Sequence, residues 1–432
     1  MFRTISNFMR IADIRKKIVF TLLMLVIFRI GTFIPVPFTD SQAISFMDDS
    51  QNVFGFLNTF GGGALQNFSI LAMGIMPYIT ASIIMQLLQM DVVPKFTEWK
   101  KQGEMGRKKI AQVTRYGTVG LAFIQGIAMS LGFNAMAGGE LIVNPTPLKY
   151  VIIAIVLTTG TAFLMWLGEQ ITANGVGNGI SIIIFAGIVA AVPNGIKQLY
   201  SQYFVNPGSD LFLNIVIVAL IALVVVAVTV GVIYIQQAER KIPVQYAKRL
   251  VNRSPVGGHS THLPLKVNAA GVIPVIFAIA FIVAPRTVAT FFEGSKAASI
   301  IEKTFDYTEP IGMVIYVVLI IAFTYFYTFV QVNPEQMAEN LQKQGGYVPG
   351  IRPGINTETY LTRVMYRLTL VGSIFLAAVS VLPILLGNLA NLPTAVQIGG
   401  TSLLIVVGVA LQTMKQLEGQ LVKRHYKGFI RS

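Results

Sequence analysis

Long, uninterrupted apolar runs are the feature that most limits how this chain can fold. A bilayer core about 30 Å thick requires about 20 apolar residues of helix to cross it. Ten such runs occur, at residues 18–38, 70–90, 111–133, 149–168, 178–193, 211–236, 268–291, 311–332, 364–386 and 394–414. Because the runs are continuous and do not alternate with polar residues, they indicate helices rather than the strands of a barrel. The sequence predicts an all-α integral membrane protein with ten transmembrane helices.

The composition excludes several kinds of chemistry. Of 432 residues, 54% are hydrophobic and 12% are charged, a balance that a soluble domain of this size could not accommodate. The chain has no cysteine, and its histidines, His259, His262 and His425, lie outside the apolar runs. It also contains no phosphate-binding glycine motif and no nucleophile–base set. We therefore expect no metal, no cofactor and no enzymatic activity.

Lysine and arginine are distributed unevenly between the two sides of the membrane. Of 33 such residues, 27 lie on the side of the N-terminus, in the terminal segments, the loops and the adjoining ends of the runs. The positive-inside rule then places both termini in the cytoplasm. Two of these loops, 237–267 and 333–363, are long and basic, which suits an acidic or RNA-rich partner. The simpler alternative is that the charges only fix the topology and contact anionic membrane lipids.

Two short motifs each occur twice in the chain. Ala72–Ile79 is similar to Ala269–Ile276, and both place a glycine three residues before a proline; Gly179–Ile184 is similar to Gly400–Ile405. Each pair falls on corresponding helices of two groups of five. We expect the glycines before the prolines to lie where a helix bends or approaches a neighbour closely. The alternative to a repeat is chance similarity between apolar helices.

The repeat divides the chain into two halves. Residues 1–200 contain spans 1–5 and residues 201–432 contain spans 6–10. Because five is an odd number, the two halves would cross the membrane in opposite directions, as in inverted-repeat transporters. We therefore expect two inverted five-helix halves around a central pore, with the functional site between them.

The matching helices offer aliphatic side chains at their corresponding points. These residues are Ile75, Ile79, Ile180, Ile184, Ile276 and Ile405. A narrow hydrophobic ring can exclude ions by dewetting and requires no hydrogen-bond pattern from what passes through it, which suits a substrate of variable sequence. Each isoleucine taken alone is more often ordinary packing. Arg29 is the only clearly intramembrane charge in this interpretation, and both a structural and a functional role stay open for it.

The segment Phe54–Asn67 is apolar at helical spacing, too short to span, and interrupted by three glycines. One interpretation is a re-entrant plug with the glycines as its hinge, because irregular backbone is tolerated at membrane depth when protein surrounds it. The other is an interfacial helix on the outer leaflet. The candidate plug residues are Phe54, Phe56, Leu57, Phe60, Gly61, Gly62, Gly63, Ala64, Leu65 and Asn67.

Three other functional classes compete with a polypeptide channel. A ten-span solute transporter fits the repeat, but such a protein should carry acidic residues or histidine inside its spans. A membrane enzyme should bring polar catalytic groups together at one depth. A membrane scaffold would explain the basic loops but not the matched glycine and isoleucine positions.

Several motifs, taken in order along the chain, are similar to those of one family. Together with the motif in span 2, they are Leu167–Thr172, Gly177–Gly187, Ser260–Asn268, Val348–Gly354 and Gly399–Ile405. They resemble the bacterial SecY family, in a form typical of Bacillus. The resemblance implies an hourglass-shaped, protein-conducting channel whose waist is the six isoleucines and whose plug is the segment 54–67. It matches no motif in the outer segment 286–309 or in the tail after Met414.

The resemblance also implies partners and a side exit. Spans 2 and 7 would separate as a lateral gate, with Thr80 and Asn178 in its polar part, and release signal sequences and membrane helices into lipid. Unfolded secretory polypeptides would pass through the pore. The basic loops would bind the SecA ATPase or the ribosome through Arg249, Arg253 and Arg352, and the small subunits SecE and SecG would complete the channel.

Overall fold

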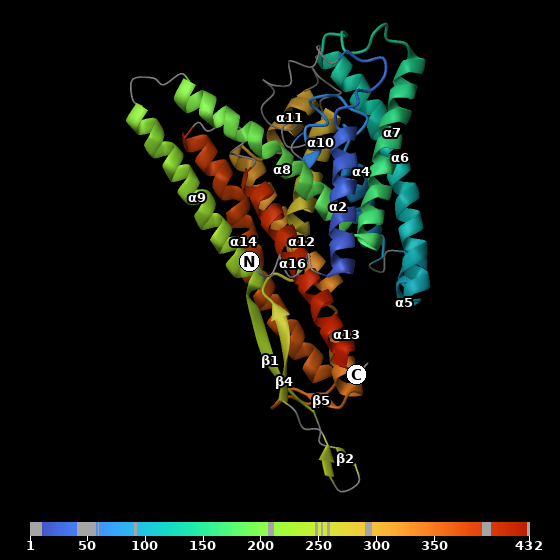
Figure 1. Ribbon diagram of the computed structural model, residues 1–432, viewed down its shortest axis with the longest axis vertical. Coiled ribbons are helices and arrows are strands. Elements are labelled where there is room, and N and C mark those ends of the chain that lie inside the picture. Colours follow the sequence, from blue (N-terminus) through green and yellow to red (C-terminus); the bar gives the residue numbers. More distant parts are fainter. Residues whose placement is uncertain are drawn as a thin grey trace.

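The computed structural model describes residues 11–40, 58, 60–89, 93–205, 211–246, 249–251, 254–256, 260–289, 296–390 and 399–429. Within these residues, ten helices correspond one to one with the ten predicted runs, and most of them lie in the upper part of Figure 1. They are α2 (Ala12–Gly31), α4 (Met76–Leu88), α6 (Glu104–Met136), α7 (Pro147–Asn174), α8 (Gly179–Tyr200), α9 (Leu211–Gln237), α10 (Ile273–Ala289), α12 (Pro310–Gln331), α14 (Ile355–Ala390) and α16 (Gly399–Phe429). The prediction of ten helices is therefore confirmed.

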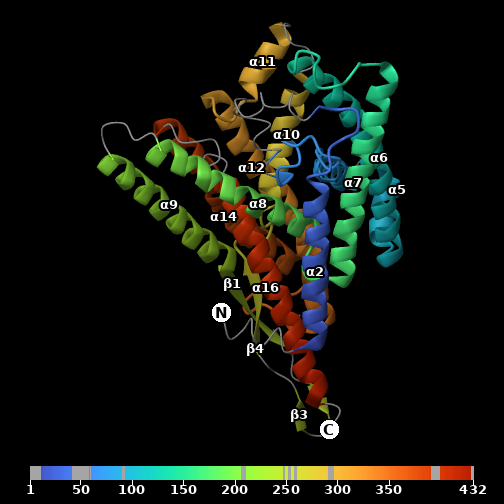
Figure 2. The ribbon, with the colours of Figure 1, turned by 45° about the horizontal axis from the view of Figure 1, so that its top comes forward.

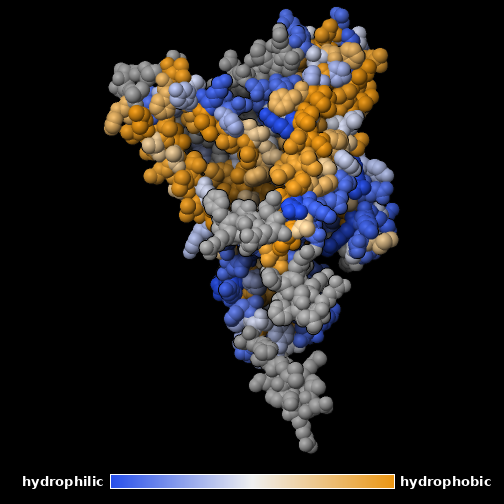
Figure 3. All heavy atoms as spheres, viewed as in Figure 1, coloured by the Kyte–Doolittle hydropathy of each residue, from blue (hydrophilic) through white to orange (hydrophobic). Residues whose placement is uncertain are grey.

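The surface of the helical part is apolar. Among the described residues, six helices are long and apolar enough to cross a membrane, namely α6, α7, α8, α9, α12 and α14, and the shorter α4 and α10 are apolar as well. Apolar side chains form a broad band across the helical part of the molecule in Figure 3, whereas hydrophilic side chains lie at its upper rim, at its right side and toward its narrow end. A surface of this kind is stable only in contact with lipid, so the chain is a multi-pass membrane protein.

The first repeated motif folds in the same way in both halves, but not as expected. Gly74 and Gly271 have φ angles of +56° and +66°, and α4 and α10 each begin two residues later with a proline at their second position. A Cβ on Gly271 would meet nothing within 4 Å, and one on Gly74 would meet its nearest atom at 3.8 Å. The prediction of a bend or close approach is therefore wrong, because each glycine forms a left-handed turn just before the helix.

The second repeated motif also begins a helix in both places. Helix α8 begins at Gly179 and α16 begins at Gly399, one residue before the glycine that matches Gly179. Figure 2 shows α16 passing beside α8 and α9, and α16 packs against both of these helices and against α14. Helices α10, α12 and α14 pack in sequence, α6 packs between α4 and α7, and α4 contacts α10 across the two halves.

A small antiparallel sheet, which the apolar runs did not predict, joins the two long basic loops. Strand β1 (Glu239–Tyr246) pairs with β4 (Ser260–Lys266) on one side and with β5 (Gly346–Tyr347) on the other. Ile242 and Val244 of β1 are buried at alternate positions and pack against α13 (Pro334–Lys343) and the first turns of α14. The sheet lies at the narrow end of the molecule in Figure 1.

Three further helices and one hairpin complete the described chain. Helix α5 (Pro94–Lys101) precedes α6, the π-helical turn η2 (Ser201–Val205) follows α8, and α11 (Lys296–Thr304) lies between α10 and α12. Strands β2 (Arg249–Val251) and β3 (Ser254–Val256) form a separate hairpin beyond the sheet.

Candidate functional site at the centre of the helices

The six candidate isoleucines come together in one apolar cluster. Ile75, Ile79, Ile184, Ile276 and Ile405 are all buried in it, with exposed fractions between 0% and 8%, and the partly buried Ile180 packs against it. Four different helices supply these side chains, and each isoleucine lies at or near the beginning of its helix. Of these helices, α8 packs against α16 and α4 packs against α10.

Glycines allow α8 to begin so close to its neighbour. A Cβ on Gly179 would lie 1.9 Å from the carbonyl oxygen of Gly168 in α7, a distance at which no side chain fits. A Cβ on Gly168 would in turn lie 3.1 Å from Cγ1 of Ile180. These two glycines therefore fix the crossing of α7 and α8 and place Ile180 and Ile184 beside the cluster.

The described part of the candidate plug is folded into the same cluster. Phe60 is 5% exposed and Ala64 is fully buried, and both side chains belong to the cluster that contains the isoleucines. Gly62 and Gly63 have positive φ angles of 67° and 85°, which turn the chain back on itself. This burial favours a re-entrant segment over an interfacial helix. Three candidate plug residues, Phe54, Phe56 and Leu57, lie outside the described residues.

The remaining described plug residues have two different neighbours. Leu65 is fully buried in a second apolar cluster with Phe68 and Leu141, and not among the isoleucines. The side-chain amide of Asn67 donates a hydrogen bond of 3.3 Å to the carbonyl of Thr32, just after α2. The segment is therefore held at both ends of its glycine turn.

One contact in the segment involves α8 directly. A Cβ on Gly187 would lie 2.5 Å from the Phe60 carbonyl oxygen and 3.1 Å from the Gly62 amide nitrogen. The backbone of the segment 60–62 therefore packs directly against the backbone of α8 at Gly187, where no side chain separates them. Gly187 ends one of the motifs noted in the sequence, but nothing in the sequence indicated this contact.

The two candidate gate residues make local hydrogen bonds. The Thr80 hydroxyl donates to the Met76 carbonyl of its own helix, at 3.1 Å. The Asn178 side-chain oxygen accepts hydrogen bonds from the amides of Ile180 and Ser181 and thereby caps α8. Asn178 therefore has a clear structural task at the beginning of α8, independent of any role in a gate.

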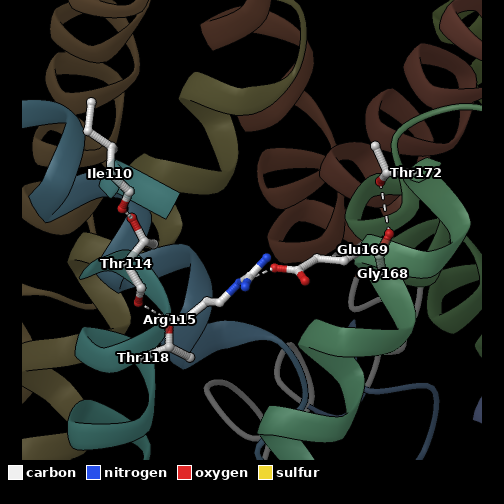
Figure 4. A network of polar contacts seen from close by, with 7 residues as sticks. All are labelled: Ile110, Thr114, Arg115, Thr118, Gly168, Glu169 and Thr172. Carbon is white, nitrogen blue, oxygen red and sulfur yellow. Dashed lines mark hydrogen bonds and ion pairs between the residues drawn. The ribbon is translucent and has the colours of Figure 1, made fainter. Parts of the chain in front are cut away.

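An ion pair between α6 and α7 was not predicted. Nε of Arg115 lies 2.7 Å from a carboxylate oxygen of Glu169, and Figure 4 shows the two side chains reaching toward each other. Arg115 lies in α6, near the beginning of the predicted run 111–133, and Glu169 lies in α7, just after the predicted run 149–168. That Arg29 is the only clearly intramembrane charge stays a prediction. Both side chains are partly exposed, so the pair contributes about 1 kcal/mol or less.

The candidate docking residues fall in or near the joined basic loops. Arg352 is exposed in the turn between β5 and α14, where its carbonyl accepts a hydrogen bond of 3.0 Å from the Thr357 hydroxyl. Arg249 begins strand β2, and Arg253 lies outside the described residues. The sheet therefore makes loops 237–267 and 333–363 one folded unit.

The outer segment 286–309, for which the sequence suggested no role, contains a largely buried ion pair. Nη2 of Arg286 lies 3.2 Å from Oδ2 of Asp306, and Oδ1 of the same carboxylate accepts hydrogen bonds from the amide and the hydroxyl of Thr308. Next to it, burial raises the pKa of Tyr307 to about 12; the Arg286 guanidinium opposes this rise and the Asp306 carboxylate adds to it. The pair ties the end of α10 to the loop before α12.

The fold and its central cluster define a class of protein. The fold matches a structure described as "The structure of a protein conducting channel" with a TM-score of 0.62 at 21% identity, over 94% of this chain and 93% of that chain. It also matches the canine Sec61 of a ribosome–channel complex from the endoplasmic reticulum, with a TM-score of 0.59 at 19% identity, over 94% and 93% of the two chains. The chain therefore shares its fold with these channel structures.

Sequence comparison identifies the family within that class. The SecY family model matches residues 69–414. The protein translocase subunit SecY of Bacillus licheniformis is 68% identical over 432 residues and covers 100% of both chains. The chain belongs to the SecY family, in agreement with the resemblance noted in its motifs. It is a protein-translocation channel subunit and not an enzyme.

Proposed function

We propose that the structure is the closed state of this channel and that the six isoleucines form its pore constriction. The observation that carries the proposal is the convergence of isoleucines from four helices, together with Phe60 and Ala64, in one buried cluster. An aliphatic ring excludes ions by dewetting when it is narrow and accepts any side chain when it widens. A translocating polypeptide would replace the plug segment in the centre of this ring.

The path into lipid follows from the contact between α4 and α10. These two helices meet across the two halves, residues 1–200 and 201–432, which we interpret as an inverted repeat. Separating them would open the cluster sideways without unfolding either half. Thr80 and Asn178 would then lie in the polar part of this lateral gate, and signal sequences and membrane-protein helices would leave through it.

We place the joined basic loops in the cytoplasm, together with both termini, in the bacterial plasma membrane. The chain has no nucleotide-binding motif, so its driving force must come from a partner or from the membrane potential. Arg249, Arg253 and Arg352 are the proposed contacts for the SecA ATPase or the ribosome. The proposal includes SecE and SecG as partner subunits of the channel, as the family resemblance implies.

Site-specific crosslinking in membranes tests the pore. A photoreactive residue is placed at Ile79, Ile184 or Ile276, and a secretory precursor is stalled during export. Leu223 of α9, which is 69% exposed, provides the lipid-facing control. Crosslinks at the three isoleucine positions but not at Leu223 would support the ring. An engaged precursor that reacts at none of the three would exclude it.

A further inference from the structure

Arg29 touches the candidate plug through the plug's backbone. This residue lies in the last turn of α2, and its Nη1 donates a hydrogen bond to the carbonyl oxygen of Gly62. Its guanidinium carbon also lies 4.7 Å from the centre of the Phe33 ring. Among the described residues, no ion pair between Arg29 and a carboxylate accompanies these contacts. The charged side chain of Arg29 is thus hydrogen-bonded to the Gly62 carbonyl.

The end of α2 surrounds the glycine turn from several directions. A Cβ on Gly62 would lie 3.4 Å from the Phe28 ring, so this ring packs against the turn on one side. The Thr32 carbonyl, one turn beyond Phe28, receives the hydrogen bond from the Asn67 amide. Ring, guanidinium and carbonyl of α2 together form a clasp around residues 62–67.

Helix α2 is itself fixed to the body of the protein. It packs against α7 and α8, and the Thr21 hydroxyl oxygen accepts a hydrogen bond of 3.1 Å from the Val176 amide in the turn that joins them. A clasp on a fixed helix can hold a mobile segment in place. Gly62 and Gly63, both at positive φ, give the held segment a backbone that can change conformation.

We propose that Arg29 is a positioning residue that latches the plug segment in its closed place through the Gly62 carbonyl. This inference rests on the proposed plug and goes beyond it by naming what holds the plug. A hydrogen bond with a charged donor strengthens in surroundings of low polarity, and its loss would increase the population of the displaced segment by roughly 10-fold to 100-fold. Opening of the channel would break this hydrogen bond, and water that enters the channel would then solvate the guanidinium.

The test compares Arg29→Met, which keeps an unbranched apolar stem but removes the charge and the donors, with Arg29→Lys, which keeps a charged donor. Ile30→Met, at a position 58% exposed on the same helix, is the matched control. Because the chain contains no cysteine, Ala64→Cys introduces a single thiol at a fully buried plug position. The readouts are its labelling rate by a membrane-impermeant maleimide and the ion conductance of idle channels in planar bilayers.

We expect Arg29→Met to raise both the labelling rate and the conductance at least about tenfold, and Arg29→Lys to restore most of the closure. Protein amount and melting temperature are measured for every variant, because a purely structural role would change these without changing labelling in the folded fraction. If Arg29→Met does not accumulate, Arg29→Gln, which keeps a donor without the charge, should label faster than Arg29→Lys.

The possible outcomes distinguish the proposed role of Arg29 from the plug assignment on which it rests. If Arg29→Met labels and conducts like Ile30→Met, while a chain shortened within residues 54–67 leaks, the latch is wrong and the plug stands. If the shortened chain is also electrically tight, the plug assignment fails and the latch fails with it.

Discussion

A single methyl group on α8 should displace the plug without changing any plug residue. In Gly187→Ala the new Cβ would lie 2.5 Å from the Phe60 carbonyl oxygen. Ordinary carbon–oxygen contacts begin at about 3.3 Å, so the segment or the helix must move by about 0.8 Å. The rigid crossing of α7 and α8 at Gly168 and Gly179 restrains the helix, so we expect the segment to move.

The size of the effect follows from the cost of overpacking. Forcing one extra methyl group into a packed site costs about 1–3 kcal/mol. At about 1.4 kcal/mol per factor of ten, this changes the ratio of displaced to seated segment by about 5-fold to 150-fold. The closed state should therefore become leaky, while export of a normal precursor continues.

The assay is the ion conductance of idle channels in planar bilayers, normalised to the amount of protein. Gly120→Ala in α6 is the matched control, because its Cβ would meet nothing within 4 Å. A conductance of Gly187→Ala equal to that of Gly120→Ala, at equal protein levels, would refute the reasoning that the segment closes the channel by resting on α8. Gly187→Val should leak more than Gly187→Ala.

Four further predictions concern other parts of the molecule. Replacing Ile276 by Asn should raise idle conductance because the ring then holds water, whereas Ile276→Leu should stay tight. Thr21→Val should lower the free energy of unfolding by about 1–3 kcal/mol, seen as a lower melting temperature in detergent, because the buried Val176 amide loses its acceptor, and Thr21→Ser should not. Arg352→Ala should slow partner-driven export without raising idle conductance, and a rate equal to that of the unchanged chain would contradict its docking role. The pKa of Tyr307, about 12 in the folded protein, lies above the ordinary value of about 10. The contribution of neutral Tyr307 to the free energy of unfolding is therefore complete below about pH 10 and is lost as the pH rises toward 12. In a series of melting curves at different pH, Tyr307→Phe should abolish this part of the alkaline loss of stability.

Much of the helical fold could be predicted from the sequence because its physical cause is local. An apolar run must become a helix in lipid, so the ten runs gave the ten helices with boundaries wrong by several residues. The largest error is at α16, which continues to Phe429 although its run ends at residue 414; α6 and α14 also extend beyond their runs, and α4 begins only at Met76. The isoleucines could be found because the repeat pointed to equivalent places in both halves.

The parts that could not be predicted depend on contacts between distant backbone atoms. The hydrogen bond from Arg29 to Gly62 ends on a carbonyl, which every residue carries and no motif marks. The contact of Gly187 with the segment 60–62 is likewise between two backbones. The sheet was missed for a different reason: β1 has an alternating pattern at Ile242 and Val244, but this pattern is short and lies within a basic loop.

The sheet has a mechanical consequence. Strand β1 follows α9, β4 runs into α10, and β5 precedes α14, so one set of backbone hydrogen bonds ties together the ends of three helices. A flexible loop would absorb a push or pull applied to it. A paired sheet is stiffer, so we expect a partner that tilts it to transmit the movement to the beginning of α10 and, through α10, to its contact with α4.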